Sequence, residues 1–298
     1  MFTFFILYDF MTYEEIWHRL AVVYPDGEAK AQARMLLEDK FGLSFADILC
    51  GGIEQLSADD TMWLARAVAR IEQMEPIQYV LGEAWFCGNR FVVGEGVLIP
   101  RPETEWLVER ACCVARDMNV ASPRILDIGT GSGCIAVSLK KVLPDAYVEA
   151  WDISEDALAI AKENAKKQEA DVVFKQRDAL ALADTDTTDS TVRQWDIIVS
   201  NPPYICDSER KDMDANVLEH EPATALFVPD DDPLLFYRSI ARYGKEALCP
   251  NGHLLFECNT RYAVDTADMM RQLGYQKVVA VDDCFAKPRF AEGVLNLT

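Results

Sequence analysis

From residue 124 onward, short apolar runs alternate with longer segments of helical periodicity, and this alternation constrains the fold more than any other feature. The runs that predict strands are "RILDI" (124–128), "AYVEAWD" (146–152), "DVVFKQRD" (171–178), "WDIIVS" (195–200) and "HLLFEC" (253–258). Such alternation is typical of a parallel, helix-covered sheet with right-handed crossovers. The last two apolar runs, "YQKVVAV" and "GVLNLT", predict an antiparallel pair that closes the sheet.

The first part of the chain has a different pattern. Residues 12 to about 75 carry apolar residues at three-to-four spacing, with polar residues at Thr12, Ser44 and Ser57 that can cap helix starts. We therefore expect a small helical bundle, as an N-terminal domain of residues 1–75. The opening segment 1–10 is apolar but short and carries Asp9, so it fits neither a signal peptide nor a membrane span. We expect those ten residues to add little.

Between the bundle and the alternating region, a short segment favours strand structure. Pro76 is expected to end the bundle, and aromatic and β-branched residues then alternate around Gly88-Asn89, which predicts a β-hairpin. We take residues 76–100 as a linker that contains this hairpin, and residues 101–298 as the α/β domain.

Composition excludes several classes of function. The 29 basic and 49 acidic side chains give a formal net charge of −20, which argues against stable binding to nucleic acid or to an anionic membrane. The nine cysteines are odd in number and include no CxxC, so we expect reduced thiols in a cytoplasm. The three histidines are scattered and have no ligand-like spacing, so we expect no metal site.

The turn after the first predicted strand is rich in glycine. The segment "LDIGTGSGCIA" joins that strand to its helix through Gly129, Gly131 and Gly133, which permit a tight turn and close approach of a ligand to the backbone. About twenty residues later the next strand ends in Asp152, whose carboxylate can accept hydrogen bonds from ribose hydroxyls. Together these features predict a nucleoside site.

The spacing of the turn bears on which nucleoside binds. The pattern is G-x-G-x-G, preceded by Asp127, whereas dinucleotide sites use G-x-G-x-x-G to place a pyrophosphate at a helix end. S-adenosylmethionine has no pyrophosphate and carries cationic groups that suit a nearby acid. Asp178, at the end of the third strand, is placed to accept a hydrogen bond from the adenine amine, or it is simply a solvated strand-end carboxylate.

The fourth strand ends abruptly in Asn201-Pro202-Pro203-Tyr204, because proline cannot continue an interior ladder. The Asn201 side-chain oxygen and the Pro202 carbonyl can accept both hydrogens of a planar amide or amine and stabilise positive charge on its nitrogen. Tyr204 can stack on the flat group. This chemistry suits methyl transfer to nitrogen.

Four segments resemble the protein-glutamine methyltransferases that modify peptide chain release factors. They are "GVLIPRPETE" (96–105), "ILDIGTGSGCIA" (125–136), "VSNPPYI" (199–205) and "HEPATAL" (220–226). The resemblance implies a Rossmann-like class I methyltransferase sheet, mostly parallel with a C-terminal antiparallel hairpin, preceded by a helical domain that helps to hold the release factor. It also implies S-adenosylmethionine as cofactor and the glutamine of a Gly-Gly-Gln motif as substrate.

The same resemblance assigns residues to the two ligands. Cofactor contacts carry over to Gly129, Thr130, Gly131, Gly133 and Asp152, and substrate contacts carry over to Asn201, Pro202 and Tyr204 with Pro203 between them. Asn201 is expected to contact the cofactor as well. At the entrance, the matching residues are Arg101, Glu103 and Thr104. Three alternatives remain: an adenine-amine methyltransferase of nucleic acid, methylation of a ribosomal-protein glutamine, and a non-catalytic binding module.

Overall fold

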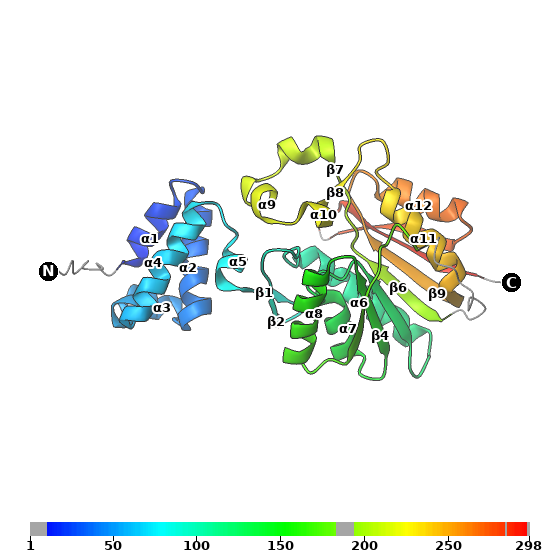
Figure 1. The fold of residues 1–298 in the computed structure, drawn as a ribbon, viewed down its shortest axis with the longest axis horizontal. Coiled ribbons are helices and arrows are strands. Elements are labelled where there is room, and N and C mark those ends of the chain that lie inside the picture. The colour runs from blue at the N-terminus through cyan, green and yellow to red at the C-terminus, as the bar shows by residue number, and fades with distance from the viewer. Residues whose placement is uncertain (1–10, 183–193, 284, 297–298) are drawn as a thin grey trace. The chain divides into compact units, whose positions relative to one another are not determined.

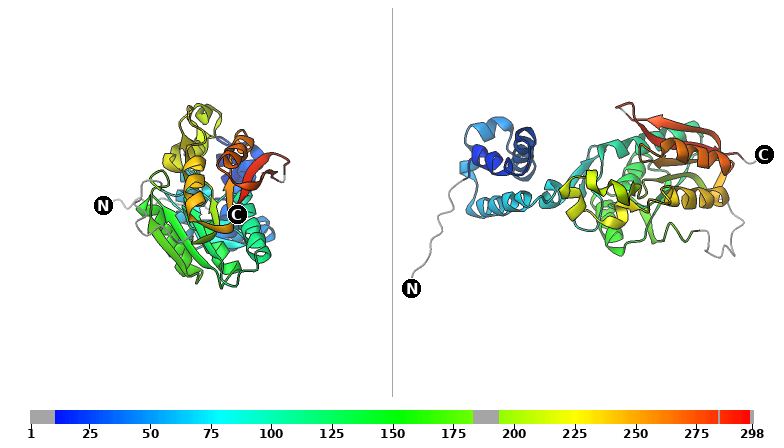
Figure 2. Two further views of the ribbon diagram at one scale, coloured as in Figure 1. Left: turned by 90° about the vertical axis from the view of Figure 1, so that its right-hand side faces the viewer. Right: turned by 90° about the horizontal axis from the view of Figure 1, so that it is seen from above.

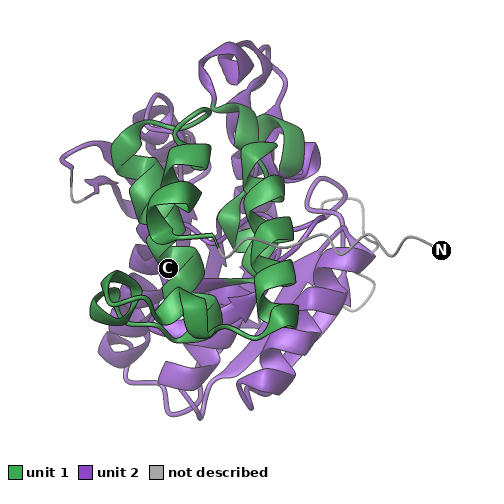
Figure 3. Ribbon diagram, turned by 90° about the vertical axis from the view of Figure 1, so that its left-hand side faces the viewer, with its two compact units in different colours: residues 1–83, 214–220 green, residues 84–213, 221–298 purple. Residues whose placement is uncertain are grey.

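The computed structural model describes residues 11–182, 194–283 and 285–296. The chain divides into two compact units, one of residues 1–83 and 214–220 and the other of residues 84–213 and 221–298 (Figure 3). Among the described residues, every helix is too short or too polar to cross a membrane. The prediction for the first ten residues lies outside the described residues.

The first unit is a helical bundle, as the sequence predicts. Its helices are α1 (Tyr13–Leu20), α2 (Asp26–Phe41), α3 (Phe45–Leu49), α4 (Ala58–Glu72), α5 (Ile77–Leu81) and α9 (Ala215–His220), with a 3₁₀ turn η1 (Gly52–Gln55). Fully buried Ile16, Leu36, Leu64 and Ile71 come from α1, α2 and α4 and share one core.

The predicted helix starts are confirmed. Thr12 and Glu15 form a reciprocal capping box, in which the Glu15 carboxylate accepts from the Thr12 backbone N–H at 2.7 Å. Ser44 and Ser57 cap α3 and α4 by accepting from the backbone N–H three residues later. These starts were predictable because a cap needs only residues close in sequence.

The prediction for the segment after Pro76 is wrong in detail. Residues Ile77–Leu81 form helix α5 rather than extended chain, because Pro76 occupies its N-cap position and Gly82, with φ of 77°, closes it. Ile77 and Val80 are buried in the core of the bundle. The division of the chain at residues 75 and 100 stays a prediction.

The predicted hairpin is present in strands β1 (Glu83–Phe86) and β2 (Asn89–Val92). Its turn is formed by Cys87 and Gly88, one residue earlier than the sequence indicated, and both have positive φ angles of 47° and 70°. Positive φ at both central residues matches the right-handed twist of the flanking strands.

The second unit contains the predicted α/β sheet, and its strand order is β10-β11-β9-β6-β3-β4-β5 (Figure 1). The strands are β3 (Arg124–Ile128), β4 (Tyr147–Asp152), β5 (Val172–Gln176), β6 (Trp195–Ser200), β9 (Leu248–Glu257), β10 (Gln276–Asp282) and β11 (Pro288–Leu295). All neighbours pair in parallel except β11, which is antiparallel to both β9 and β10. Figure 2 shows the β10–β11 pair at one edge of the unit.

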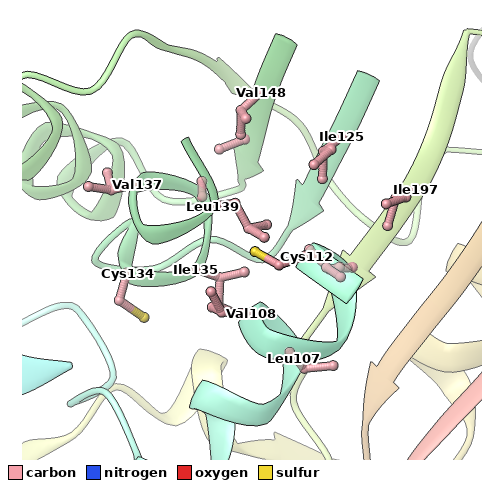
Figure 4. Close-up of a cluster of buried hydrophobic side chains, with 14 of the residues drawn as sticks. Leu107, Val108, Cys112, Ile125, Cys134, Ile135, Val137, Leu139, Val148 and Ile197 are labelled. Atoms are coloured by element: carbon pink, nitrogen blue, oxygen red, sulfur yellow. The ribbon is translucent and has the colours of Figure 1, made fainter. Parts of the chain in front are cut away.

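Helices cover both faces of this sheet. Helices α6 (Glu105–Asp117), α7 (Cys134–Val142) and α8 (Glu155–Lys167) pack on one face, and α11 (Leu235–Ala247) and α12 (Ala263–Gln272) pack on the other. Alternate residues of a strand serve the two cores, so Ile125 faces α6 and α7 whereas Leu126 faces α11 and α12. Figure 4 shows Val108 of α6 beside Ile135 of α7, with Ile125 and Ile197 on two strands of the sheet.

Shorter elements lie between the strands. Before α6 the 3₁₀ turn η2 (Pro102–Thr104) follows the second hairpin strand. After β6 come β7 (Ile205–Cys206), η3 (Asp207–Asp212), α10 (Ala223–Leu226) and β8 (Phe227–Val228), and β7 pairs in parallel with β8. The sequence analysis did not predict this small sheet.

The strand order reverses direction between β3 and β6. From β3 the chain adds β4 and β5 on one side, and β6 and β9 lie on the other. In such sheets ligands bind beyond the carboxyl ends of the strands at this reversal. Ile128 pairs with Ser200 there, so the glycine-rich turn and the Asn201 segment leave the sheet side by side.

Gly133 is required for the packing of α7 on α8. Its φ is +79°, and a Cβ atom at this position would lie 3.0 Å from the Ala161 Cβ and 3.2 Å from the Ala161 Cα. The backbone conformation and the lack of space therefore both select glycine.

We predict that Gly133→Ala lowers the free energy of unfolding more than Gly274→Ala. Gly274 also has a positive φ, +97°, but a Cβ there meets nothing within 4 Å. Both substitutions cost about 1–2 kcal/mol of backbone strain, and crowding at residue 133 adds about 1–3 kcal/mol. Thermal unfolding of the two variants measures the difference. Equal melting temperatures would show that Ala161 can move aside at no cost.

Candidate functional site

One cavity of about 370 Å³ lies at the carboxyl ends of β3, β4 and β6. It brings together seven of the residues that the sequence singled out: Gly129, Gly131, Asp152, Asp178, Asn201, Pro202 and Pro203. The segments "GVL" (96–98) and "TA" (224–225) complete part of its wall. A mostly apolar pocket with a few convergent polar groups is the usual form of a small-molecule site.

Backbone hydrogen bonds hold the glycine-rich turn against the end of β4. The N–H groups of Gly129 and Thr130 both donate to the Trp151 carbonyl, each at 2.9 Å. The Gly131 N–H donates to Asp152 Oδ2 at 2.8 Å. The turn is thus tied to the acidic residue that the sequence analysis placed opposite it.

Asp152 is held on both of its carboxylate oxygens. Oδ2 accepts from Gly131, and Oδ1 accepts from the Ser154 N–H at 2.9 Å. Each oxygen keeps further acceptor capacity for a hydroxyl donor. Burial raises the pKa of Asp152, and the backbone donors from Ser154 and Gly131 oppose that rise.

Asp127 and Thr130 lie beneath the turn rather than in the cavity wall. The Thr130 hydroxyl donates to Asp127 Oδ2 at 2.6 Å, and both side chains are buried. Burial raises the pKa of Asp127 to about 7, the nearby Asp152 also raises it, and the Thr130 hydrogen bond lowers it. A direct contact of Asp127 with a cationic ligand stays a prediction.

The far part of the cavity has an exposed acid and apolar side chains. Asp178 lines the cavity, and its Oδ1 accepts from the Leu180 N–H at 2.8 Å. Ile153, Leu180 and Phe236 supply apolar wall. An adenine-like ring could be held here between apolar surfaces, with Asp178 available to its amine.

The Asn201 side chain is anchored at one end only. Its Nδ2 donates to the Thr104 hydroxyl oxygen at 3.2 Å, and no described residue donates to its Oδ1. The preceding residue, Ser200, donates its hydroxyl to the Ile128 carbonyl at 2.6 Å, which ties the end of β6 to the end of β3. Asn201 therefore projects from a rigid position at the edge of the sheet.

The structure does not bring the Tyr204 ring into the wall of this cavity. Its hydroxyl donates to Glu257 Oε1 at 3.2 Å, its carbonyl accepts from the Asn259 amide at 3.1 Å, and burial raises its pKa. Tyr204 lines a neighbouring cavity of about 420 Å³, to which Arg289 also contributes. Stacking of Tyr204 on a substrate stays a prediction.

An ion pair joins two of the family-like segments. Arg101 donates to Glu221 at 2.6 Å, and the Ile99 N–H donates to the other Glu221 oxygen at 3.2 Å. Glu221 is almost wholly buried, which strengthens the pair. Glu103 is half-buried beside Thr104 in η2. Glu221 stands in the segment "HEPATAL", and its ion pair with Arg101 was not predicted from the sequence.

Sequence reasoning also missed Glu257, the last residue of β9. Its Oε2 accepts from the Thr104 hydroxyl at 2.7 Å, and its other oxygen accepts from Tyr204. The sequence did hold a clue: in "HLLFEC" a glutamate ends an otherwise apolar strand. An acid at that position could have been predicted to lie at the carboxyl edge of the sheet, near the site.

Two family models match the chain. Residues 112–226 match the family described as "Methyltransferase small domain", and residues 14–82 match the "PrmC N-terminal domain".

Curated relatives match over nearly their whole length. A release factor glutamine methyltransferase of Bacteroides thetaiotaomicron is 47% identical over 267 residues, which cover 90% of this chain and 93% of that protein. The release factor glutamine methyltransferase of Flavobacterium psychrophilum is 38% identical over 273 residues, which cover 91% of this chain and 93% of that protein.

Among solved structures, the chain resembles the hMettl16 catalytic domain in complex with the MAT2A 3′UTR hairpin 6. The TM-score is 0.51 at 15% identity, and the match covers 70% of this chain and 75% of that one. At this identity the likeness concerns the fold alone.

Proposed function

The chain belongs to the release factor glutamine methyltransferase family, and from this premise we propose its reaction in detail. It transfers a methyl group from S-adenosylmethionine to the side-chain amide nitrogen of the glutamine in the Gly-Gly-Gln motif of a peptide chain release factor. The observation that carries the proposal is the single cavity in which the glycine-rich turn and Asp152 meet Asn201 and Pro202.

The donor set of the cavity fits S-adenosylmethionine. When bound, this cofactor supplies an electrophilic methyl group on a sulfonium. Asp152 would accept from the ribose hydroxyls with the acceptor capacity that its backbone donors leave free. Asp178 would accept from the adenine amine. Gly131 leaves room for the ligand, since a Cβ there would meet nothing within 4 Å.

The remaining predicted cofactor residues would act on the shape of the turn. Asp127 holds the Thr130 hydroxyl, and Gly129 and Gly133 permit the positive φ angles of the loop. In this proposal Asp127 contributes less negative charge to the site than an ordinary carboxylate, because a pKa of about 7 leaves it partly protonated near neutral pH.

On the substrate side, Asn201 would accept one hydrogen of the glutamine amide through Oδ1, and the Pro202 carbonyl would accept the other. The amide nitrogen is a weak nucleophile because its lone pair is delocalised. The two acceptors stabilise the positive charge that grows on this nitrogen, and they aim its lone pair. The nitrogen becomes acidic as it is methylated, so it can lose its proton late without a strong base.

We assign the neighbouring residues to substrate positioning. Pro203 lines the same cavity, and Tyr204 would contact the substrate amide from the adjoining one. Arg101, through its pair with Glu221, would keep the entrance segments together. Glu103 and Thr104 lie in η2 at the same entrance.

Two broader assignments complete the proposal. The helical domain at residues 1–75 would help to hold the release factor, because a large protein substrate needs contact area beyond the cavity. The reaction would take place in the cytoplasm, which agrees with the state of the cysteines: all eight among the described residues are free thiols.

The function is tested by incubating the protein with isotopically labelled S-adenosylmethionine and purified release factors. We expect the label on the glutamine of the Gly-Gly-Gln motif, as mapped by mass spectrometry. Nucleic acid and ribosomal proteins are included as competing substrates. Label that appears on adenine, or only on a ribosomal protein, would contradict the proposal.

We predict that Asp152→Ala weakens cofactor binding and leaves the fold intact. Loss of hydrogen bonds to a charged group costs about 1.5–3 kcal/mol, which is about 10- to 150-fold in Kd. Calorimetric titration with S-adenosylmethionine measures this change in Kd. The control is Asp145→Ala, which removes an exposed carboxylate near the opposite end of the same strand and should bind normally. Unchanged affinity in Asp152→Ala would remove the ribose assignment.

Asn201→Ala should lower kcat by about 10²–10³-fold, the effect of deleting one preorganised group that stabilises developing charge. Most of the loss should fall on kcat, since the interaction strengthens in the transition state. Cofactor affinity, measured by calorimetry, should change little. A variant with nearly normal kcat would mean that this residue merely ends the strand.

A further inference from the structure

Glu257 is a buried carboxylate for which the proposed reaction has no direct use. Its exposed fraction is 1%, and no cation of the described residues lies within ion-pairing distance. It is held instead by two hydroxyl groups, those of Thr104 at 2.7 Å and Tyr204 at 3.2 Å. Burial raises the pKa of Glu257, whereas the Thr104 hydrogen bond and the charge of Arg289 lower it. Burial of a carboxylate is costly, and an apolar side chain would fill the same place without that cost.

The position of Glu257 follows from the sheet. Ser200 pairs with Phe256 in the parallel ladder between β6 and β9. The next residues in each strand are Asn201 and Glu257, so the two leave the sheet on neighbouring central strands. Thr104 reaches the same place from η2, and its exposed fraction is 3%.

The Thr104 hydroxyl makes both of its side-chain contacts inside the site. Thr104 ends η2 and leads into α6 with helical φ and ψ angles of −65° and −20°, so its side chain does not cap α6. The hydroxyl donates to Glu257 and accepts from the Asn201 amide.

Hydrogen-bond direction is fixed along this chain of groups. Both oxygens of Glu257 accept hydrogen bonds from hydroxyl groups, so the single proton of the Thr104 hydroxyl is donated to Glu257. Only oxygen lone pairs then remain for Asn201, which must present its NH₂ end to Thr104. The carbonyl end of the amide is thereby left free to accept from a ligand.

An asparagine amide has no such preference by itself. Its oxygen and nitrogen ends have nearly the same shape, so the surrounding hydrogen bonds decide which end points where. A flip by 180° would present two donors to a substrate that also brings donors, and the amide hydrogens of a glutamine would then lose their acceptor.

We propose that Glu257 and Thr104 are positioning residues that set the polarity of the Asn201 amide and so make it an acceptor. This inference rests on the proposed function, because it assigns Asn201 Oδ1 to the substrate amide. Glu257 touches neither substrate nor cofactor in this account, and it acts on Asn201 through Thr104.

The test begins with Glu257→Gln, which keeps the shape of the side chain. The new amide can donate to Thr104, whose proton can then turn to Asn201, so the polarity is no longer fixed. We expect kcat for release-factor methylation to fall by about 10- to 100-fold, in line with the cost of misplacing a reacting group. Affinity for S-adenosylmethionine and KM for the release factor should change little.

A matched control separates this effect from a general loss of stability. Glu149 is also a buried carboxylate of the sheet, with an exposed fraction of 2%, and it accepts from Trp151 Nε1 at 2.6 Å. Unlike Glu257, it also forms an ion pair, with Lys175 at 2.7 Å. Glu149→Gln should lower the melting temperature without lowering kcat. A comparable fall in kcat in both variants would overturn the specific role of Glu257.

The decisive comparison is made in the Asn201→Ala background. If Glu257 acts through Asn201, adding Glu257→Gln to Asn201→Ala leaves the residual kcat unchanged. A further tenfold fall in the double variant would show an independent role and overturn the inference. If Glu257→Gln does not fold, Thr104→Val takes its place, with the same expected loss alone and the same lack of effect with Asn201→Ala.

The outcomes also separate this inference from the proposed function. A wild-type protein that methylates no release-factor glutamine overturns the function and, with it, the premise of the inference. A wild-type protein that does so, with Glu257→Gln and Thr104→Val both keeping kcat within twofold, overturns the positioning role alone.

Discussion

The candidate site depends on the parallel pairing of β3 with β6, in which Ile128 lies opposite Ser200. Gly129 follows β3, and Pro202 and Pro203 follow β6 after Asn201. Both segments therefore leave the sheet at the same position along the strands. The Ser200 hydroxyl donates a hydrogen bond to the Ile128 carbonyl at 2.6 Å, which holds the ends of the two strands together. The glycine-rich turn and the Asn201 segment thereby become neighbours, although 72 residues separate Ile128 from Ser200 in sequence.

Two buried acids hold this edge of the sheet in the same way. Asp127 accepts from the Thr130 hydroxyl at 2.6 Å, and Glu257 accepts from the Thr104 hydroxyl at 2.7 Å. In each pair a buried carboxyl group accepts a hydrogen bond from a threonine hydroxyl. The first pair shapes the cofactor turn, and in our account the second gives Asn201 its polarity. Both carry a stability cost through burial, and burial raises both pKa values.

Much of this could be predicted from sequence, where the cause is local. Helix caps and the glycine turn involve residues within three or four positions of each other, and the strand–helix alternation required a parallel sheet. The role of Glu257 could not be predicted, because its partner Thr104 lies 153 residues away. The hydrogen bond from Tyr204 to Glu257 could not be predicted for the same reason, since 53 residues separate the two in sequence. Helix α5 was missed because burial of Ile77 in the bundle outweighs the local strand propensity.

The central claim is that Asn201 accepts a hydrogen bond from the amide that is methylated. The most direct test is a neutron crystal structure of the protein with S-adenosylhomocysteine and a Gly-Gly-Gln peptide, because it locates the amide hydrogens that distinguish the two ends of Asn201. We predict the glutamine amide nitrogen within hydrogen-bond distance of Asn201 Oδ1 and the Pro202 carbonyl, with Asn201 Nδ2 still on Thr104. A glutamine bound elsewhere, or an Asn201 amide whose nitrogen end faces the peptide, would contradict the account.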